Sequence, residues 1–459
     1  MFESFFSFLS YVDHYAWSYI GIPSILLLGL FLSIKANWFQ IVNFGKITRL
    51  FFSFVQDEHP DKRGIHPIKA FFASLGGCIG VGNIVVVCTA VQMGGPGAVF
   101  WMWVAAFIGM IVKYAEIYLG IKYRVKNKDD SYDGGPMYFL QQATSNVWIP
   151  RIVSVLLCIY GTDIYVFRIV SHTMISMWGF DKQLVIIGLL LAIVYATRKG
   201  VDRVGTITSI TIPAFLAVFS TITLLVFMKN LSAIPDLMKL IFTSAFTGHA
   251  AVAGFGGASV LMTISQGMKR ACYSGDIGIG YAAVINSETD EADPAKQAAL
   301  SIFGVFIDTF IVSTMSVFLI LITGLWSQGI HEGKIVALAI QGYLSFITVL
   351  WPAFIFLLGY SNIIAIFSVG QKAACFLSPI YGKKLYLLYA LPVFLIFSYI
   401  IILILITKMR ILISNDDGLY SEGLNILIDF AKSITDDVRV VVRRGIGRLR
   451  AVIVERVVT

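Results

Sequence analysis

Two apolar segments of this chain are rich in glycine, and their composition points to binding chemistry. They read LGGCIGVGNIVVV at residues 75–87 and GHAAVAGFGGASV at residues 248–260. Glycine lets a backbone leave helical geometry at little steric cost. A helix that unwinds inside lipid exposes N–H and C=O groups, which then need an ion, a substrate, water or another protein segment as partner. Two such breaks predict a transport site in which the backbone itself takes part in binding.

The glycines of these segments have two interpretations. They can open the helix so that the backbone approaches a ligand, or they can let neighbouring membrane helices pack closely. The sequence gives both interpretations equal weight. The candidate substrate-binding glycines are Gly76, Gly77, Gly80 and Gly82 in the first segment, and Gly254, Gly256 and Gly257 in the second.

Composition shows whether the helices that contain these breaks lie in water or in lipid. The 459 residues are 57% hydrophobic and only 14% charged, with a mean hydropathy of +0.81. Such a chain is a polytopic membrane protein. The net charge of +8 is explained by basic loops that face anionic lipid, so we expect no nucleic-acid partner. The five cysteines are scattered singly, and we expect no metal, redox centre or other cofactor.

Apolar runs long enough to cross a bilayer predict ten helices. Loops on one side of them hold nineteen Lys and Arg residues, and loops on the other side hold four, up to the end of the last helix. This asymmetry places the N-terminus outside and the loop after the first helix in the cytoplasm. The predicted helices span residues 16–36, 68–92, 95–121, 150–175, 183–197, 205–227, 248–268, 298–324, 343–370 and 385–407.

The tail does not fit this topology. Ten helices return the C-terminus to the outside, yet residues 409–459 are strongly basic and would belong in the cytoplasm. We therefore predict two domains, a membrane transporter domain at residues 1–408 and a foreign or frameshifted tail at residues 409–459.

Longer motifs carry a resemblance. The run GVGNIVVVCTAVQMGGPGAVFWMWVAAFIGMIVKYAEIYLGIKYR, then DGGPMYFL, and later GVFIDTFIVST resemble the alanine/glycine:cation symporter family. The resemblance implies an all-α, LeuT-type fold of two inverted five-helix repeats with one extra N-terminal helix, and we expect the last repeat helix to be missing here. It also implies a multi-pass protein of the cell membrane that moves a small amino-acid substrate with Na⁺ as coupling ion. Breaks in corresponding helices of two halves independently point to a midplane site.

The resemblance also implies roles for individual residues. Asn83 matches the family's substrate-contacting asparagine, and a side-chain amide can donate to a carboxylate and accept from an ammonium group; its alternative is a helix–helix hydrogen bond. Asp308 and Thr309 are the cation-binding or cavity-lining candidates of the matched run. Asp276 joins them because it stands where the family's RGxFSNEAGxGS element has glutamate, within KRACYSGDIGIGY. For Asp308 we favour a structural or cavity-lining role over direct ligation.

Other polar residues lie within predicted spans. A charge at a helix centre costs roughly 2.5–3.5 kcal/mol on insertion scales, so Asp163, Arg168 and Asp308 should face the protein interior. Lys113 and Glu116 are one turn apart and could pair with each other. His172 is expected to be a polar core residue.

Two further function classes remain. The segment MRILISNDDGLYSEGLNILIDFAKSI, from Met409, resembles the start of SurE-type nucleotidases, and Asp416 and Asp417 match their paired metal-binding aspartates. One carboxylate pair without further ligands is a poor site for a catalytic divalent ion, so we predict no metal site and no enzyme. The alternatives are a membrane-anchored nucleotidase or phosphatase, and a truncated inactive transporter. The chain contains no GxxxxGK[ST] loop, which argues against ATP-driven transport.

Overall fold

The computed structural model is built almost entirely of helices. It describes residues 8, 11–12, 15–56, 64–127, 131–247, 260–328, 330, 332–408, 411–415, 438–442 and 453–456. Within these residues the chain divides into two compact units, Met1–Ala390 and Leu391–Thr459, and helix α20 (Gly382–Lys408) runs from the first into the second. The predicted boundary at residue 408 stays a prediction.

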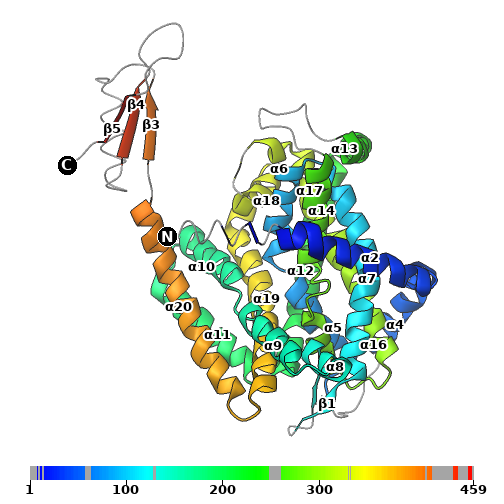
Figure 1. Cartoon of the computed structure of the whole chain (residues 1–459). Helices are drawn as coiled ribbons and strands as arrows, with labels where there is room; N and C mark the ends of the chain where they lie inside the picture. The colour runs from blue at the N-terminus through cyan, green and yellow to red at the C-terminus, as the bar shows by residue number, and fades with distance from the viewer. Residues whose placement is uncertain are drawn as a thin grey trace. The chain divides into compact units, whose positions relative to one another are not determined.

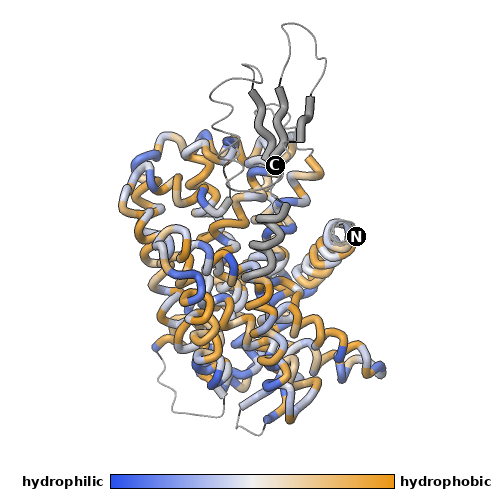
Figure 2. Tube along the Cα trace, turned by 90° about the vertical axis from the view of Figure 1, so that its left-hand side faces the viewer, coloured by the Kyte–Doolittle hydropathy of each residue, from blue (hydrophilic) through white to orange (hydrophobic). Residues whose placement is uncertain are grey.

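The first unit is a bundle of long apolar helices (Figure 1). Six helical stretches of the described residues are long and apolar enough to cross a membrane, and the bent pair α5 and α6 can supply a seventh. The tube in Figure 2 is hydrophobic along most helices, with hydrophilic residues concentrated in loops. The long stretches are η1–α2 (Ala16–Lys35), α7 (Ala98–Lys122), α9–α10 (Trp148–Trp178), α12 (Val201–Lys229), α16–α17 (Pro294–Ile322) and α19 (Ile347–Leu377).

Most of the ten predicted ranges overlap a helix of the structure over most of their length. Residues 183–197 form the shorter apolar helix α11 (Lys182–Thr197), and residues 385–407 lie within α20. Residues 248–259 of the seventh range lie outside the described residues, and α14 (Val260–Ser274) follows them. Helices that hydropathy did not predict also occur, namely α3 (Phe39–Val42), α4 (Phe44–Gln56), α8 (Pro136–Ala143), α13 (Ile234–Thr247), α15 (Tyr281–Asn286) and α18 (Glu332–Gln341).

Local sequence explains several helix starts. The Asp181 and Asp293 side chains accept hydrogen bonds from the first backbone N–H groups of α11 and α16, as good N-caps do. Proline follows the cap at the start of α16 and of α5 (Pro67–Cys78), where its missing N–H costs nothing. These polar starts lie in loops, so each apolar helix begins at a defined residue.

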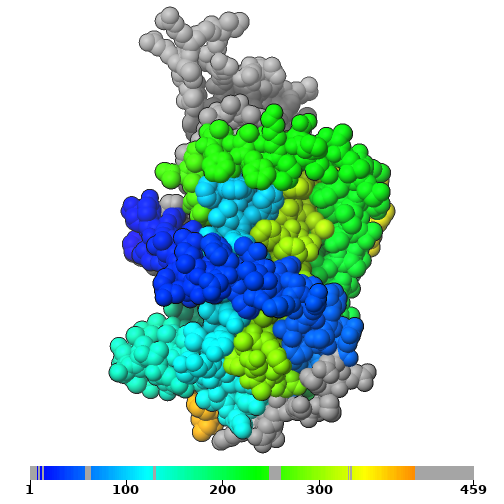
Figure 3. Space-filling model, turned by 90° about the vertical axis from the view of Figure 1, so that its right-hand side faces the viewer, coloured from blue at the N-terminus to red at the C-terminus, as the bar shows by residue number. Residues whose placement is uncertain are grey.

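Helix α7 lies at the centre of the first unit. It packs against α14, α16, α15 and α2 (Ile22–Lys35). A Cβ on Gly29 would lie 2.6 Å from the Ile108 carbonyl oxygen, so α2 can approach α7 closely only through a glycine. In the space-filling view the N-terminal helices, coloured blue, cross one face of the bundle (Figure 3). The core also includes the contacts of α12 with α5 and of α19 with α9 and α10.

Besides η1 (Ala16–Gly21), near the N-terminus, two membrane helices contain wide π-helical turns. One is η2 (Gly82–Val86), which continues as α6 (Val87–Gly94), and the other is η4 (Phe306–Ser313) within the α16–α17 stretch. Such turns frequently occur at functional sites because they leave ordinary helical hydrogen bonds unmade. Asn83 lies in the first wide turn, and Asp308 and Thr309 lie in the second.

Described strands of the second unit form a small sheet. Strand β4 (Val438–Val442) pairs in parallel with β3 (Ile411–Asn415) and antiparallel with β5 (Ile453–Arg456). Asp416 and Asp417 follow β3 directly and lie outside the described residues. The nucleotidase-like resemblance of this segment therefore stays a prediction.

Candidate functional site

The first predicted break exists and is held by neutral side chains. Helix α5 ends at Cys78 and the chain becomes helical again at Gly82, after a bend of 46°. Asn83 Oδ1 accepts a hydrogen bond from the Gly80 N–H at 3.0 Å, and Asn362 Nδ2, from α19, donates to the Gly77 carbonyl. Two amide side chains thus replace backbone bonds that the bend removes.

A buried cluster of oxygens surrounds Asn83. Its Nδ2 lies 2.6 Å from Asp308 Oδ1, 2.8 Å from Ser274 Oγ and 3.1 Å from Ser313 Oγ. Asp308 Oδ2 accepts hydrogen bonds of 2.9 Å from Ser274 and Thr309. All of these side chains are buried. An amide nitrogen has two hydrogens, so the cluster holds more oxygen acceptors than Asn83 can satisfy.

A second unwound segment lies beside the first. Helix α14 ends at Ser274, α15 begins at Tyr281, and residues 275–280 between them are not helical. Asp276, Gly278 and Gly280 have positive φ angles of 47°, 78° and 94°, a conformation that favours glycine. The glycines expected to form a second break, Gly254, Gly256 and Gly257, lie outside the described residues. Within the described residues, it is residues 275–280 that meet the first break.

Charged side chains of α7 hold this second segment. Lys113 Nζ donates to the Gly275 carbonyl at 2.6 Å and lies 2.9 Å from Cys78 Sγ. Glu116 Oε2 accepts a hydrogen bond from the Gly278 N–H at 3.1 Å. The expected pairing of Lys113 with Glu116 is therefore replaced by separate contacts to Gly275 and Gly278 of the unwound segment.

Asp276 has different partners from Asp308. The Tyr160 hydroxyl, at the end of α9 (Trp148–Tyr160), donates to Asp276 Oδ1, and Cys78 Sγ lies 3.5 Å from Asp276 Oδ2. The two predicted cation or cavity residues thus belong to neighbouring groups rather than to one ligand set.

The structure around Tyr160 differs from three predictions, namely a continuous helix over residues 150–175, an inward-facing Arg168 and a core position for His172. The helix is interrupted between α9 and α10 (Ile164–Trp178), and Asp163 caps α10 by accepting from the Val166 N–H at 3.0 Å. Asp163 is half-buried, whereas Arg168 and His172 are exposed. The predictions that Arg168 faces the interior and that His172 is a core residue are wrong, because hydropathy alone does not show which face of a helix is covered.

Neighbouring atoms distinguish the candidate glycines of the first break. A Cβ on Gly76 would lie 2.7 Å from Thr208 Cγ2, and one on Gly80 would lie 2.8 Å from Asn362 Nδ2. A Cβ on Gly77 would collide with the Tyr281 hydroxyl. A Cβ on Gly82 would meet nothing within 4 Å. Close packing thus requires the first three glycines, and only Gly82 borders open space.

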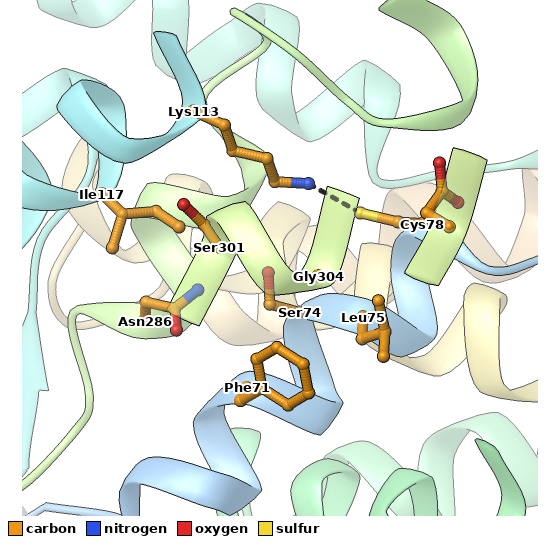
Figure 4. A pocket seen from close by; sticks show the side chains of 10 residues that line it. Phe71, Ser74, Leu75, Cys78, Lys113, Ile117, Asn286, Ser301 and Gly304 are labelled. Atoms are coloured by element: carbon orange, nitrogen blue, oxygen red, sulfur yellow. Dashed lines mark hydrogen bonds between the residues drawn. The ribbon is translucent and has the colours of Figure 1, made fainter. Parts of the chain in front are cut away.

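A small cavity lies beside the two breaks. Its volume is about 10 Å³, room for about one water and too little for an amino acid. Figure 4 shows the Lys113 and Cys78 side chains pointing toward each other at its edge. The lining of the cavity comprises Phe71, Ser74, Leu75, Cys78, Lys113, Ile117, Asn286, Ser301, Gly304 and Asp308.

Ion pairs link α19 to the loop before α8 and to the turn before α16 at one end of the bundle. Lys372 Nζ, near the end of α19, lies 2.6 Å from Asp133 Oδ1 and also pairs with Glu288. We call Lys372, Asp133 and Glu288 the Lys372 latch. Burial raises the pKa of Glu288, and the Lys372 ammonium opposes that shift. The latch borders a cleft of about 1360 Å³, on the side to which the charge count assigns the cytoplasm; basic residues lining it include Lys69, Lys126, Arg151, Arg198 and Lys199.

Sequence reasoning missed several residues of the site. Ser274 and Ser313 touch Asn83, Asn362 holds the first break, and Tyr160 binds Asp276. Ser274 and Ser313 had a detectable signal, since Ser274 occupies the serine position of the family element quoted above and Ser313 lies in the matched run GVFIDTFIVST. Among the residues that the structure describes, no group of three or more His, Cys, Asp or Glu side chains could hold a metal ion.

Comparison with known proteins agrees with a helical membrane transporter. The fold is shared with a Na⁺-coupled sialic acid symporter, at a TM-score of 0.50 and 15% identity over 86% of this chain and 81% of that one. The family model described as the sodium:alanine symporter family matches residues 2–414. The chain therefore belongs to the sodium:alanine symporter family. It is a multi-pass membrane transporter and not an enzyme.

Curated relatives cover most of the chain. A sodium/alanine symporter of Methanococcus maripaludis is 34% identical over 70% of this chain and 71% of its own length. An uncharacterized transporter of Haemophilus influenzae is 31% identical over 83% of this chain and 84% of its own.

Proposed function

We propose that this protein is a secondary active transporter of the cell membrane that moves small neutral amino acids, such as alanine or glycine, together with Na⁺ by alternating access. The buried cluster around Asn83 and Asp308 carries the proposal, because it joins an amide and a carboxylate at a helix break. The family match and the printed names of the relatives support it. Two inverted five-helix repeats are the architecture we propose around this site.

The chemistry of the cluster fits both the coupling cation and the amino-acid substrate. Hard cations are bound by oxygen. Asp308 supplies a carboxylate, its partners Ser274 and Thr309 supply hydroxyl oxygens, and Ser313, a partner of Asn83, supplies another. Asn83 can donate to a substrate carboxylate or accept from its ammonium. Gly82 leaves open space at the start of η2, where the positive end of a helix attracts a carboxylate.

Uptake into proteoliposomes tests this function. Labelled alanine and glycine are supplied with an inward Na⁺ gradient, or with choline in place of Na⁺. We expect Na⁺-dependent accumulation that Asn83→Ala abolishes, because the variant loses every contact of the amide. Asn230→Ala is the matched control, since Asn230 bonds Tyr343 and Val226 at the end of α12, away from the cluster. Folded wild-type protein without Na⁺-dependent uptake of either amino acid would contradict the proposal.

A further inference from the structure

The Lys113 ammonium lies where two broken helices end. Helix α5 ends at Cys78 and α14 ends at Ser274. Lys113 Nζ contacts Cys78 Sγ at 2.9 Å and the Gly275 carbonyl at 2.6 Å. The side chain comes from the middle of α7, and the residue is only 5% exposed. One buried cation therefore contacts the backbone carbonyl that follows α14 and the side-chain thiol of the last residue of α5.

Two helix ends of the same polarity create a demand for positive charge. Each helix C-terminus carries roughly half a negative elementary charge, and freed carbonyls inside a membrane must find a partner. In transporters with broken helices, such carbonyl ends are where cations bind. Here an ammonium on the protein already meets that demand.

The opposite end of the second break is held by an opposite charge. Glu116 lies one turn along α7 from Lys113, and its carboxylate accepts from the Gly278 N–H at 3.1 Å. A cation on the carbonyl side and an anion on the amide side match the polarity of the unwound backbone. Asp276 adds a further carboxylate nearby, at 3.5 Å from Cys78 Sγ.

We propose that Lys113 is a tethered cation. Its ammonium permanently occupies the junction of the two half-helix C-termini, so no inorganic cation binds there, and the coupling ion is left with the Asp308 cluster. Glu116 is the positioning residue that holds the same break at its amide end. This inference rests on the proposed Na⁺ coupling and specifies it, since it assigns one coupling cation to each transport cycle.

Sodium dependence of the Lys113→Met variant tests the proposal. Wild-type uptake should depend on Na⁺ with a Hill coefficient of about 1. The variant frees the carbonyl junction for a second ion, so its coefficient should rise toward about 2, the number of sites. Lys122→Met, at the exposed end of the same helix, is the matched control and should behave as wild type. A wild-type Na⁺ dependence in Lys113→Met would overturn the proposal.

A second measurement does not depend on knowing the substrate. Thermal unfolding of purified protein is followed while NaCl replaces choline chloride at constant ionic strength. The melting temperature of Lys113→Met should rise more steeply with Na⁺ than that of wild type or Lys122→Met. Equal slopes would overturn the tethered cation, even if the uptake assay found no transported amino acid. Conversely, failed uptake with a steeper slope would contradict only the proposed substrate.

Two more variants separate the effect of the Lys113 charge from that of its hydrogen bond. They also keep the proposal testable if Lys113→Met does not fold. Lys113→Arg keeps the charge and should retain the wild-type Na⁺ dependence. Lys113→Gln can still donate to the Gly275 carbonyl but carries no charge, so it should show the steeper Na⁺ dependence. A Lys113→Gln protein indistinguishable from wild type would show that the hydrogen bond, and not the cation, matters, and would overturn the proposal.

Discussion

The two breaks of this transporter are stabilised by different chemistry. Neutral amides of Asn83 and Asn362 hold the first break, whereas Lys113 and Glu116 hold the second with full charges. Charged hydrogen bonds are roughly twice as strong as neutral ones. The first break can therefore exchange its partners for a ligand at lower cost, and the second is better suited to act as the fixed wall against which the ligand binds.

The largest effect expected from this comparison is at Asp308, the acceptor on the ligand side. In Asp308→Asn the new amide would replace one acceptor by a donor that faces the Asn83 amide. An unsatisfied buried group costs about 1–3 kcal/mol, which corresponds to about a 5- to 150-fold loss of Na⁺-dependent uptake. The initial rate of alanine uptake measures it. Asp181→Asn is the control, because asparagine also caps a helix; equal rates for the two variants would contradict the role of Asp308.

An intermediate effect is expected where the two breaks touch. Gly77→Ala places a methyl group against the Tyr281 hydroxyl, and overpacking costs typically about 1–3 kcal/mol. The melting temperature in detergent should fall. In a Tyr281→Ser background, which has the residue of the family element and lacks the obstructing ring, Gly77→Ala should lower the melting temperature less than it does in the wild-type background. If Gly77→Ala cost the same in both backgrounds, this contact would not be the cause.

The smallest effect on stability is expected at Gly82. Because a Cβ there meets nothing within 4 Å, Gly82→Ala should change the free energy of unfolding by no more than about 0.5 kcal/mol. The methyl group would instead enter open space beside the ligand. Alanine uptake should therefore fall more than glycine uptake, as competition between the two labelled substrates would show. Gly188→Ala, on α11 and equally unobstructed, should leave the ratio unchanged.

Sequence predicted the first break, because glycines mark that position locally, and the substrate contact expected of Asn83 stays a prediction. Residues 275–280 also contain three glycines, but the sequence predicts the second break at residues 248–260 instead. The backbone of residues 275–280 is held by Lys113 and Glu116, which lie about 160 positions earlier in the chain, and no local pattern reveals such support. Arg168 shows the same limit, since a charge within an apolar run does not say which side of the helix is covered. Asn83 and Asp308 were each named, but only the fold shows that they touch.

The Lys372 latch has a kinetic consequence. A single ammonium with two carboxylate partners can release one while it keeps the other, so that end of the bundle need not open in one step. Two small barriers are crossed faster than one barrier of their combined height. The order in which Asp133 and Glu288 separate from Lys372 then decides whether the loop before α8 or the turn before α16 moves first.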